Sequence, residues 1–179
     1  MSYLVAVDIG IRNLGLAVYD YKEKTLVEWI RVDLCEGQKY VPCKNVEYVH
    51  MFIAKYQHYF DKAHIVLVER QMRVNMRILE SVFHSRFFEK CVIVAAQSVK
   101  LHFSICCRDY KKNKKRAVEW LHCHWNQMVK HHIINIDEWN SVWLHEKKQD
   151  DLADALIMLL YYVNTCSNIV NTVVEEHDD

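Results

Sequence analysis

Glycine and proline are scarce in this sequence, with three glycines and one proline among 179 residues. No Pro-rich, Ser-rich or repetitive stretch separates blocks that could fold independently. The hydrophobic content of 51% is sufficient for a sizeable core in a chain of this length. We therefore expect one domain over residues 1–179, with a short acidic tail over about 171–179.

The sequence also has no net charge, because 23 lysines and arginines balance 23 aspartates and glutamates. It therefore lacks the basic excess that is common in nucleic-acid binders. No long apolar run indicates a secretion signal or a membrane span, which predicts an intracellular protein with no membrane partner. The seven cysteines show no paired CxxC spacing, so they fit a reducing compartment.

Positive charge is nevertheless concentrated in two places. Residues 111–116 are almost wholly basic, and a second cluster contains Arg70, Arg73 and Arg77. A basic run of this kind is as typical of a solvated face or a localisation signal as of a phosphate-binding surface. Composition alone leaves both interpretations open.

Hydrophobic periodicity predicts an α/β fold with a mixed central sheet flanked by helices. Three N-terminal strands are expected to form an antiparallel hairpin region, and two later apolar runs are typical of buried strands. The expected strands cover residues 3–7, 14–19, 26–32, 64–68 and 91–96, and the expected helices cover 45–60, about 75–89, about 117–129 and 150–163. The order of three strands, helix, strand, helix and strand, followed by further helices, indicates an α/β domain whose mixed sheet contains a hairpin.

Four acidic residues stand at the ends of these apolar elements. Asp8 ends the first strand, Glu69 ends the fourth, and Asp151 and Asp154 open the last helix. The spacing of three residues places Asp151 and Asp154 on one helical face. Clustered carboxylates repel each other unless a cation neutralises them, and oxygen ligands suit Mg²⁺ or Mn²⁺. Singly, each acid could equally be a turn residue, a solvated strand end or a helix cap.

Three segments resemble the motifs of RuvC-type Holliday junction resolvases, especially their poxvirus, large-DNA-virus and mitochondrial branches. Residues 5–15 (VAVDIGIRNLG) are similar to the first motif, 66–71 (VLVERQ) to the second, and 151–156 (DLADAL) to the third. The motifs occur in the family's order and cover nearly the whole chain. The resemblance implies a ribonuclease H-like fold.

The resemblance also implies the site. Asp8, Glu69, Asp151 and Asp154 match the family's metal-binding tetrad, which would hold two Mg²⁺ or Mn²⁺ ions per active site. Asp150 also faces nearly the same way as Asp154, so it could replace or assist Asp151, although the resemblance favours Asp151. A catalytic lysine is expected just before the helix near residue 117, and it is assigned to Lys115, with Lys114 as the alternative.

On the same basis, the expected activity is cleavage of four-way DNA junctions by a homodimer, with no small-molecule cofactor. A two-fold dimer is the natural match for a substrate with pseudo-two-fold symmetry. The expected location is the cytoplasm of an infected host cell, if the protein is viral. The residues expected to contact DNA phosphates are Arg70, Arg73, Arg77, Lys111, Lys112 and Arg116.

Other functions remain as alternatives. The same four acids would serve a ribonuclease H-like nuclease that acts on flaps, displacement loops or structured RNA. The turn at residues 8–15 also resembles the first phosphate loop of actin-like nucleotide-binding proteins, but all three glycines lie near the start, so no second glycine-rich loop is available. A non-catalytic junction-binding module is disfavoured because all four acids are present.

Overall fold

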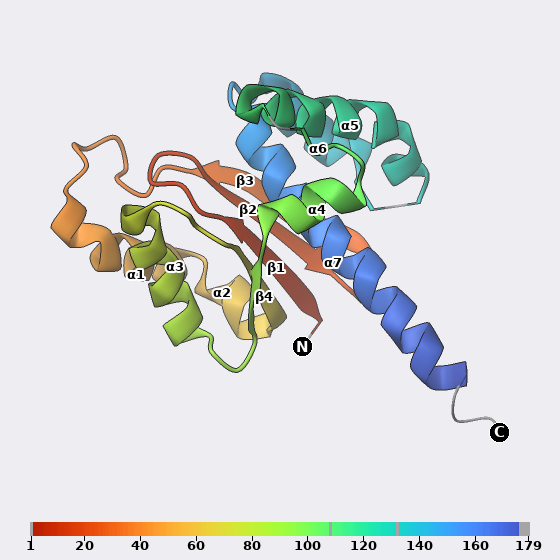
Figure 1. Cartoon of the computed structure of the whole chain (residues 1–179), viewed down its shortest axis with the longest axis horizontal. Helices are drawn as coiled ribbons and strands as arrows, with labels where there is room; N and C mark the ends of the chain where they lie inside the picture. Colours follow the sequence, from red (N-terminus) through yellow and green to blue (C-terminus); the bar gives the residue numbers. More distant parts are fainter. Residues whose placement is uncertain (1, 108, 132, 176–179) are drawn as a thin grey trace.

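The computed structural model describes residues 2–107, 109–131 and 133–175. They form five strands, seven α-helices and a short 3-10 helix (Figure 1). The strands are β1 (Tyr3–Asp8), β2 (Leu14–Asp20), β3 (Thr25–Val32), β4 (Ala63–Glu69) and β5 (Cys91–Val94). The helices are η1 (Pro42–Lys44), α1 (Asn45–Lys55), α2 (Gln57–Lys62), α3 (Val74–Arg86), α4 (Ala96–His102), α5 (Tyr110–Lys130), α6 (Ile136–His145) and α7 (Gln149–Glu175).

The five strands form one mixed sheet in the order β3-β2-β1-β4-β5. β1, β2 and β3 pair antiparallel, whereas β4 pairs parallel with β1 and β5 pairs parallel with β4. The expected hairpin region and the mixed sheet are therefore confirmed. Because β1, β4 and β5 run in the same direction, their carboxyl ends share one edge of the sheet.

Both faces of the sheet are covered by helices, with α1, α2 and α3 on one side and α4 to α7 on the other (Figure 1). β1 shows how one strand serves both layers. Leu4 and Ala6 are buried in the core under α5 and α7, and Val5 and Val7 are buried in the core under α1 and α3. Successive side chains of a strand point to opposite faces, so a strand between two helical layers is apolar throughout.

Helix α7 lies unusually close to the sheet at its first turns. A Cβ atom added to Gly15 of β2 would lie 2.4 Å from the backbone oxygen of Asp151, so only glycine permits this approach. The indole Nε1 of Trp29 in β3 donates a buried hydrogen bond of 2.9 Å to the backbone oxygen of Leu152. Together these two contacts fix the start of α7 over the sheet.

Several boundaries differ from the expected ones. The helix expected over 45–60 is two helices, because the chain leaves helical geometry at Tyr56 (φ −107°, ψ 20°). The fifth strand ends at Val94, and the short helix α4 follows it directly. Helix α5 begins at Tyr110 rather than near residue 117, after Asp109, whose carboxylate accepts a hydrogen bond from the backbone N–H of Lys112. The basic run is thus helical.

Hydrophobic periodicity did not predict helix α6, just as it did not predict α4. Helix α6 contributes a tryptophan to a cluster of aromatic rings. Its Trp143 stacks on Trp29 with ring centroids 5.2 Å apart and on Trp125 of α5 with centroids 6.0 Å apart. Only the packing of three distant segments defines this core. No helix in the described part of the chain is long and apolar enough to traverse a lipid bilayer.

Replacing Gly15 by alanine is expected to lower the free energy of unfolding by about 3 kcal/mol or more, because the new Cβ would collide with the backbone of α7. Gly37→Ala is the matched control. A Cβ there meets nothing within 4 Å, so the positive φ of 80° alone should cost about 1 kcal/mol. Urea denaturation measures both, and a G15A loss no larger than that of G37A would contradict the close approach.

Candidate active site

Two carboxylates lie side by side at the carboxyl edge of the sheet. Val7 of β1 pairs with Val68 of β4, so Asp8 and Glu69 follow on adjacent parallel strands. The Glu69 carboxylate accepts a hydrogen bond of 2.9 Å from Gln71 Nε2. Glu80 of α3 accepts a hydrogen bond of 2.5 Å from the backbone N–H of Gln71, which ties this loop to the helix. Glu69 is therefore held in orientation by its own loop.

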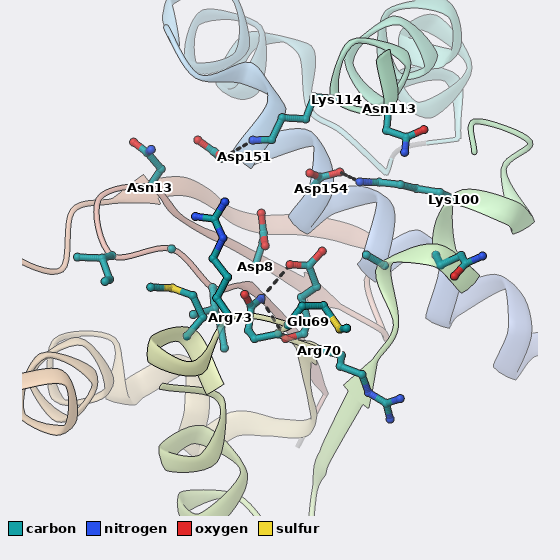
Figure 2. A pocket seen from close by; sticks show the side chains of 18 of the residues that line it. Asp8, Asn13, Glu69, Arg70, Arg73, Lys100, Asn113, Lys114, Asp151 and Asp154 are labelled. Atoms are coloured by element: carbon teal, nitrogen blue, oxygen red, sulfur yellow. Dashed lines mark hydrogen bonds and ion pairs between the residues drawn. The ribbon is translucent and has the colours of Figure 1, made fainter. Parts of the chain in front are cut away.

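Helix α7 brings two further carboxylates to the same edge. Asp151 and Asp154 line a cavity of about 950 Å³ together with Asp8 and Glu69 (Figure 2). Among the described residues, only two polar or charged ones are buried, and Asp151 is one of them, with 7% of its surface exposed. Asp150 is not among the residues that line the cavity. The tertiary structure thus gathers the four predicted acids from three elements.

Two lysines contact the aspartates of α7. Lys114 of α5 makes an ion pair with Asp150 and lies 3.3 Å from Asp151 Oδ1. The Nζ of Lys100, on α4, lies 3.4 Å from Asp154 Oδ1. Figure 2 shows both ammonium groups directed toward these carboxylates from separate helices. Each α7 aspartate therefore has a lysine counter-ion.

Lys115, to which the sequence analysis assigned the catalytic role, lies away from the four acids. Lys115 is 78% exposed and pairs with Glu119 along α5 at 3.3 Å, and it does not line the cavity. Because α5 begins before the basic run, consecutive lysines point about 100° apart around the helix. That rotation turns Lys114 toward the acids and Lys115 toward solvent.

The predicted DNA-contacting arginines occupy different positions around the cavity. Arg70 and Arg73 line it, and Arg73 extends toward the carboxylates whereas Arg70 turns away from them (Figure 2). Arg77 is exposed on α3, outside the cavity lining. The planar guanidinium group of an exposed arginine can bind a phosphate through two hydrogen bonds.

The described basic residues at the start of α5 other than Lys114 lie outside the cavity lining, near its rim. Lys112 and Arg116 are exposed, and Arg116 donates a hydrogen bond of 3.1 Å to the backbone oxygen of Cys106, which lines the cavity. The side chain of Lys111 lies outside the described residues. The start of α5 therefore carries the basic run to the cavity rim.

Like charges and burial perturb the acids strongly. Burial, followed by the charges of Glu69 and Asp154 and a side-chain hydrogen bond with Glu69, raises the pKa of Asp8 well above its usual range. Burial also raises the pKa of Asp154 to about 6, although the Lys100 ammonium opposes the shift. For Asp151, burial raises the pKa against the opposing effect of Lys114. The site therefore favours protons or cations near its carboxylates.

The donor set fits a divalent metal ion. Asp151 Oδ2 is buried and has no hydrogen-bond partner among the described residues, so one carboxylate oxygen has an unused lone pair. All four candidate ligands are carboxylates, which are the ligands that Mg²⁺ and Mn²⁺ prefer. Within the described ranges, no three acidic, His or Cys side chains already converge as a ligand group. The ammonium groups of Lys100 and Lys114 contact two of the acids instead.

Sequence reasoning missed Lys100 and Gln71, and it gave no role to Asn13 and Asn113, which also line the cavity. One signal was available for Lys100. β5 is parallel to β4, so the residues that follow β5 must reach the same edge as Glu69. Short helix α4 carries no periodic pattern long enough to reveal itself, and its lysine was overlooked for that reason.

The sheet order, with carboxylates at two adjacent strand ends and on the last helix, defines a ribonuclease H-like fold of the RuvC type. The family model described as Poxvirus A22 protein matches residues 2–166. The chain therefore belongs to the Poxvirus A22 protein family. No curated protein matches the sequence.

Solved structures of resolvases share this fold. The fowlpox virus resolvase in complex with its substrate Holliday junction DNA has a TM-score of 0.66 at 17% identity, with 92% of this chain and 98% of that chain covered. The yeast mitochondrial Holliday junction resolvase Ydc2 has a TM-score of 0.65 at 16% identity, with 92% and 85% covered. Thermus thermophilus RuvC has a TM-score of 0.55 at 15% identity, with 91% and 96% covered. The predicted fold and family resemblance are confirmed.

Because the pKa values of Asp8 and Asp154 are raised, we expect the free energy of unfolding of the metal-free protein to fall as pH rises. For Asp154, the folded pKa of about 6 exceeds the ordinary value of 3.8, so the folded state binds more protons and the free energy of unfolding falls between about pH 4 and 6. The raised pKa of Asp8 acts in the same direction. We expect Asp8→Asn to be more stable than the unsubstituted protein at about pH 8 in chelator, because it removes a buried negative charge.

Urea denaturation at several pH values checks this expectation. Asp61→Asn, an exposed change on α2, is the control and should leave the pH dependence as it is. Added Mg²⁺ should stabilise the unsubstituted protein more at about pH 8 than at about pH 5, because binding competes with protons. Equal stability of D8N and the unsubstituted protein at the higher pH would contradict the cost of burying the Asp8 charge beside the other acids.

Proposed function

We propose that this chain is a structure-selective endonuclease that cleaves four-way (Holliday) DNA junctions. The observation that carries the proposal is that Asp8, Glu69, Asp151 and Asp154 line one cavity, with basic side chains at its rim. Membership of the Poxvirus A22 protein family and the likeness to the fowlpox virus resolvase bound to its junction support this substrate. The whole chain would act as a single nuclease domain.

The same four carboxylates would hold two Mg²⁺ or Mn²⁺ ions. When bound, such ions supply an activated water and stabilise the leaving oxygen in phosphodiester hydrolysis. The support in this chain is the all-oxygen donor set and the unpartnered, buried Asp151 Oδ2. Gln71 would keep the Glu69 carboxylate turned into the cavity through its hydrogen bond of 2.9 Å.

Other side chains would position the DNA. Lys114 is in place to hold the scissile phosphate, because its flexible stem starts on α5 and its ammonium reaches the α7 aspartates. Arg73 would neutralise a phosphate at the opposite side of the cavity, with Arg70, Arg77, Lys112 and Arg116 farther out. Such phosphate contacts set register and carry no sequence information, so junction shape would decide where the enzyme binds.

We also propose a homodimer that acts in the cytoplasm of an infected host cell. A four-way junction has two equivalent strands to cut, and two copies related by a two-fold axis would present two active sites to them. Membership of a poxvirus protein family supports the location. Symmetric cutting would resolve recombination or replication intermediates such as viral DNA concatemers.

Purified protein with Mg²⁺ is expected to cut a four-way junction into nicked duplexes with 5′-phosphate and 3′-hydroxyl ends. Flaps, linear duplex and an RNA/DNA hybrid serve as competing substrates on denaturing gels. Asp154→Asn should lose at least about 100-fold in rate, more than the loss of a group that only hydrogen-bonds to a metal ligand. Preference for the hybrid or the linear duplex would overturn the junction assignment, and full activity in chelator would overturn the metal mechanism.

The two neighbouring lysines give a second test. Lys114→Met should reduce the single-turnover cleavage rate by about 100-fold, because it removes a positive charge beside the carboxylates. Lys115→Met should reduce it much less, because Lys115 is exposed and pairs with Glu119. A larger loss for K115M than for K114M would contradict the assignment of Lys114 to the scissile phosphate.

A further inference from the structure

Lys100 is a charged side chain of the cavity that belongs neither to the three motifs nor to the basic run. It lies on α4, which follows β5, and the neighbouring Val99 is buried in the core under α7. Its Nζ lies 3.4 Å from Asp154 Oδ1, and both side chains are only 13% exposed. A lysine at this depth is anchored at its backbone and free to move only at its tip.

The ammonium group and a metal ion would compete for the same carboxylate. Mg²⁺ binds carboxylate oxygens at about 2.0–2.1 Å and requires near-octahedral geometry. An ammonium that remained at 3.4 Å from Asp154 Oδ1 would then lie within a few ångströms of a dication. The two positive charges repel strongly in a partly buried site, so Lys100 must leave Asp154 when the ion binds.

Lys100 cannot simply leave Asp154 unreplaced, because a largely buried ammonium without a counter-ion is costly. Lys114 keeps Asp150, which does not line the cavity, whereas Asp154 is the only acid among the described residues that forms an ion pair with Lys100. The other acids beside Lys100, Asp8 and Glu69, are themselves candidate metal ligands. The remaining direction is outward, into the cavity that Lys100 also lines.

We propose that Lys100 exchanges partners during the reaction cycle. In the metal-free protein its ammonium neutralises Asp154, and after a divalent cation takes that carboxylate the ammonium binds a non-bridging phosphate oxygen of DNA in the cavity. Each group then has a partner of opposite charge in both states. The ammonium pairs first with Asp154 and then with the phosphate, and Asp154 pairs first with the ammonium and then with the cation. Lys100 is thereby both a competitor of the metal ion and a ligand of the substrate. The inference rests on the proposed nuclease function.

The first test measures metal binding without DNA. Isothermal titration with Mg²⁺ should show Lys100→Met binding the ion about fivefold or more tightly than the unsubstituted protein, because the competing charge is gone. Lys100→Gln removes the same charge but can still hydrogen-bond to Asp154, so it provides a second neutral variant if the first fails to fold. Lys44→Met, which removes an exposed lysine that pairs with Glu47 on α1, is the control.

The second test measures DNA binding with Ca²⁺ in place of Mg²⁺. The slope of log affinity against log salt concentration should fall by about one in the neutral variants, as expected for the loss of one phosphate contact. Lys100→Arg keeps the charge and should keep the slope. Unchanged or weaker Mg²⁺ affinity in both neutral variants, or an unchanged salt slope, would overturn the exchange.

These outcomes are separate from those that decide the junction proposal. The metal titration uses no DNA, and the salt slope is read equally well on linear duplex. If the protein cuts no four-way junction while the neutral variants show both changes, the partner exchange stands and the junction assignment fails. If the unsubstituted protein binds no Mg²⁺ at all, the partner exchange and the metal mechanism both fail.

Discussion

The mutual repulsion of four carboxylates in one partly buried place constrains everything else in this structure. Asp8, Glu69, Asp151 and Asp154 line one cavity although their charges repel, and burial raises the pKa of Asp8 and of Asp154. Such an arrangement persists only where packing elsewhere holds it in place. It is typical of sites in which a cation completes the charge balance.

Contacts away from the acids keep the four carboxylates in place. Parallel pairing fixes Asp8 beside Glu69, and the contacts of α7 with Gly15 and Trp29 set the height of Asp151 and Asp154 above them. The same helix buries Leu152, Leu156 and Leu159 completely. The hydrophobic burial of one helix thus offsets the electrostatic cost of the residues on its first turns.

The site combines rigid anions with flexible cations. The carboxylates project from strand ends and from a docked helix, so their positions are set by the fold. The lysines reach them on long stems from α4 and α5, and arginines stand at the rim. Fixed ligands suit a metal ion that demands strict geometry, whereas mobile ammonium groups suit a DNA backbone that must enter, react and leave.

The sequence by itself determined the strands, the mixed sheet and the four acids, because buried strands and the residues that end them leave a local pattern. It did not determine which lysine faces Asp151, because the direction of each lysine depends on where α5 begins. The cap formed by Asp109 sets the start of α5, and a cap leaves no periodic pattern in the sequence. Nor did the sequence reveal Lys100, whose helix of seven residues is too short for a pattern. Only the tertiary structure places β5 beside β4 and so brings Lys100 to Asp154, because strand order depends on packing between residues far apart in the chain.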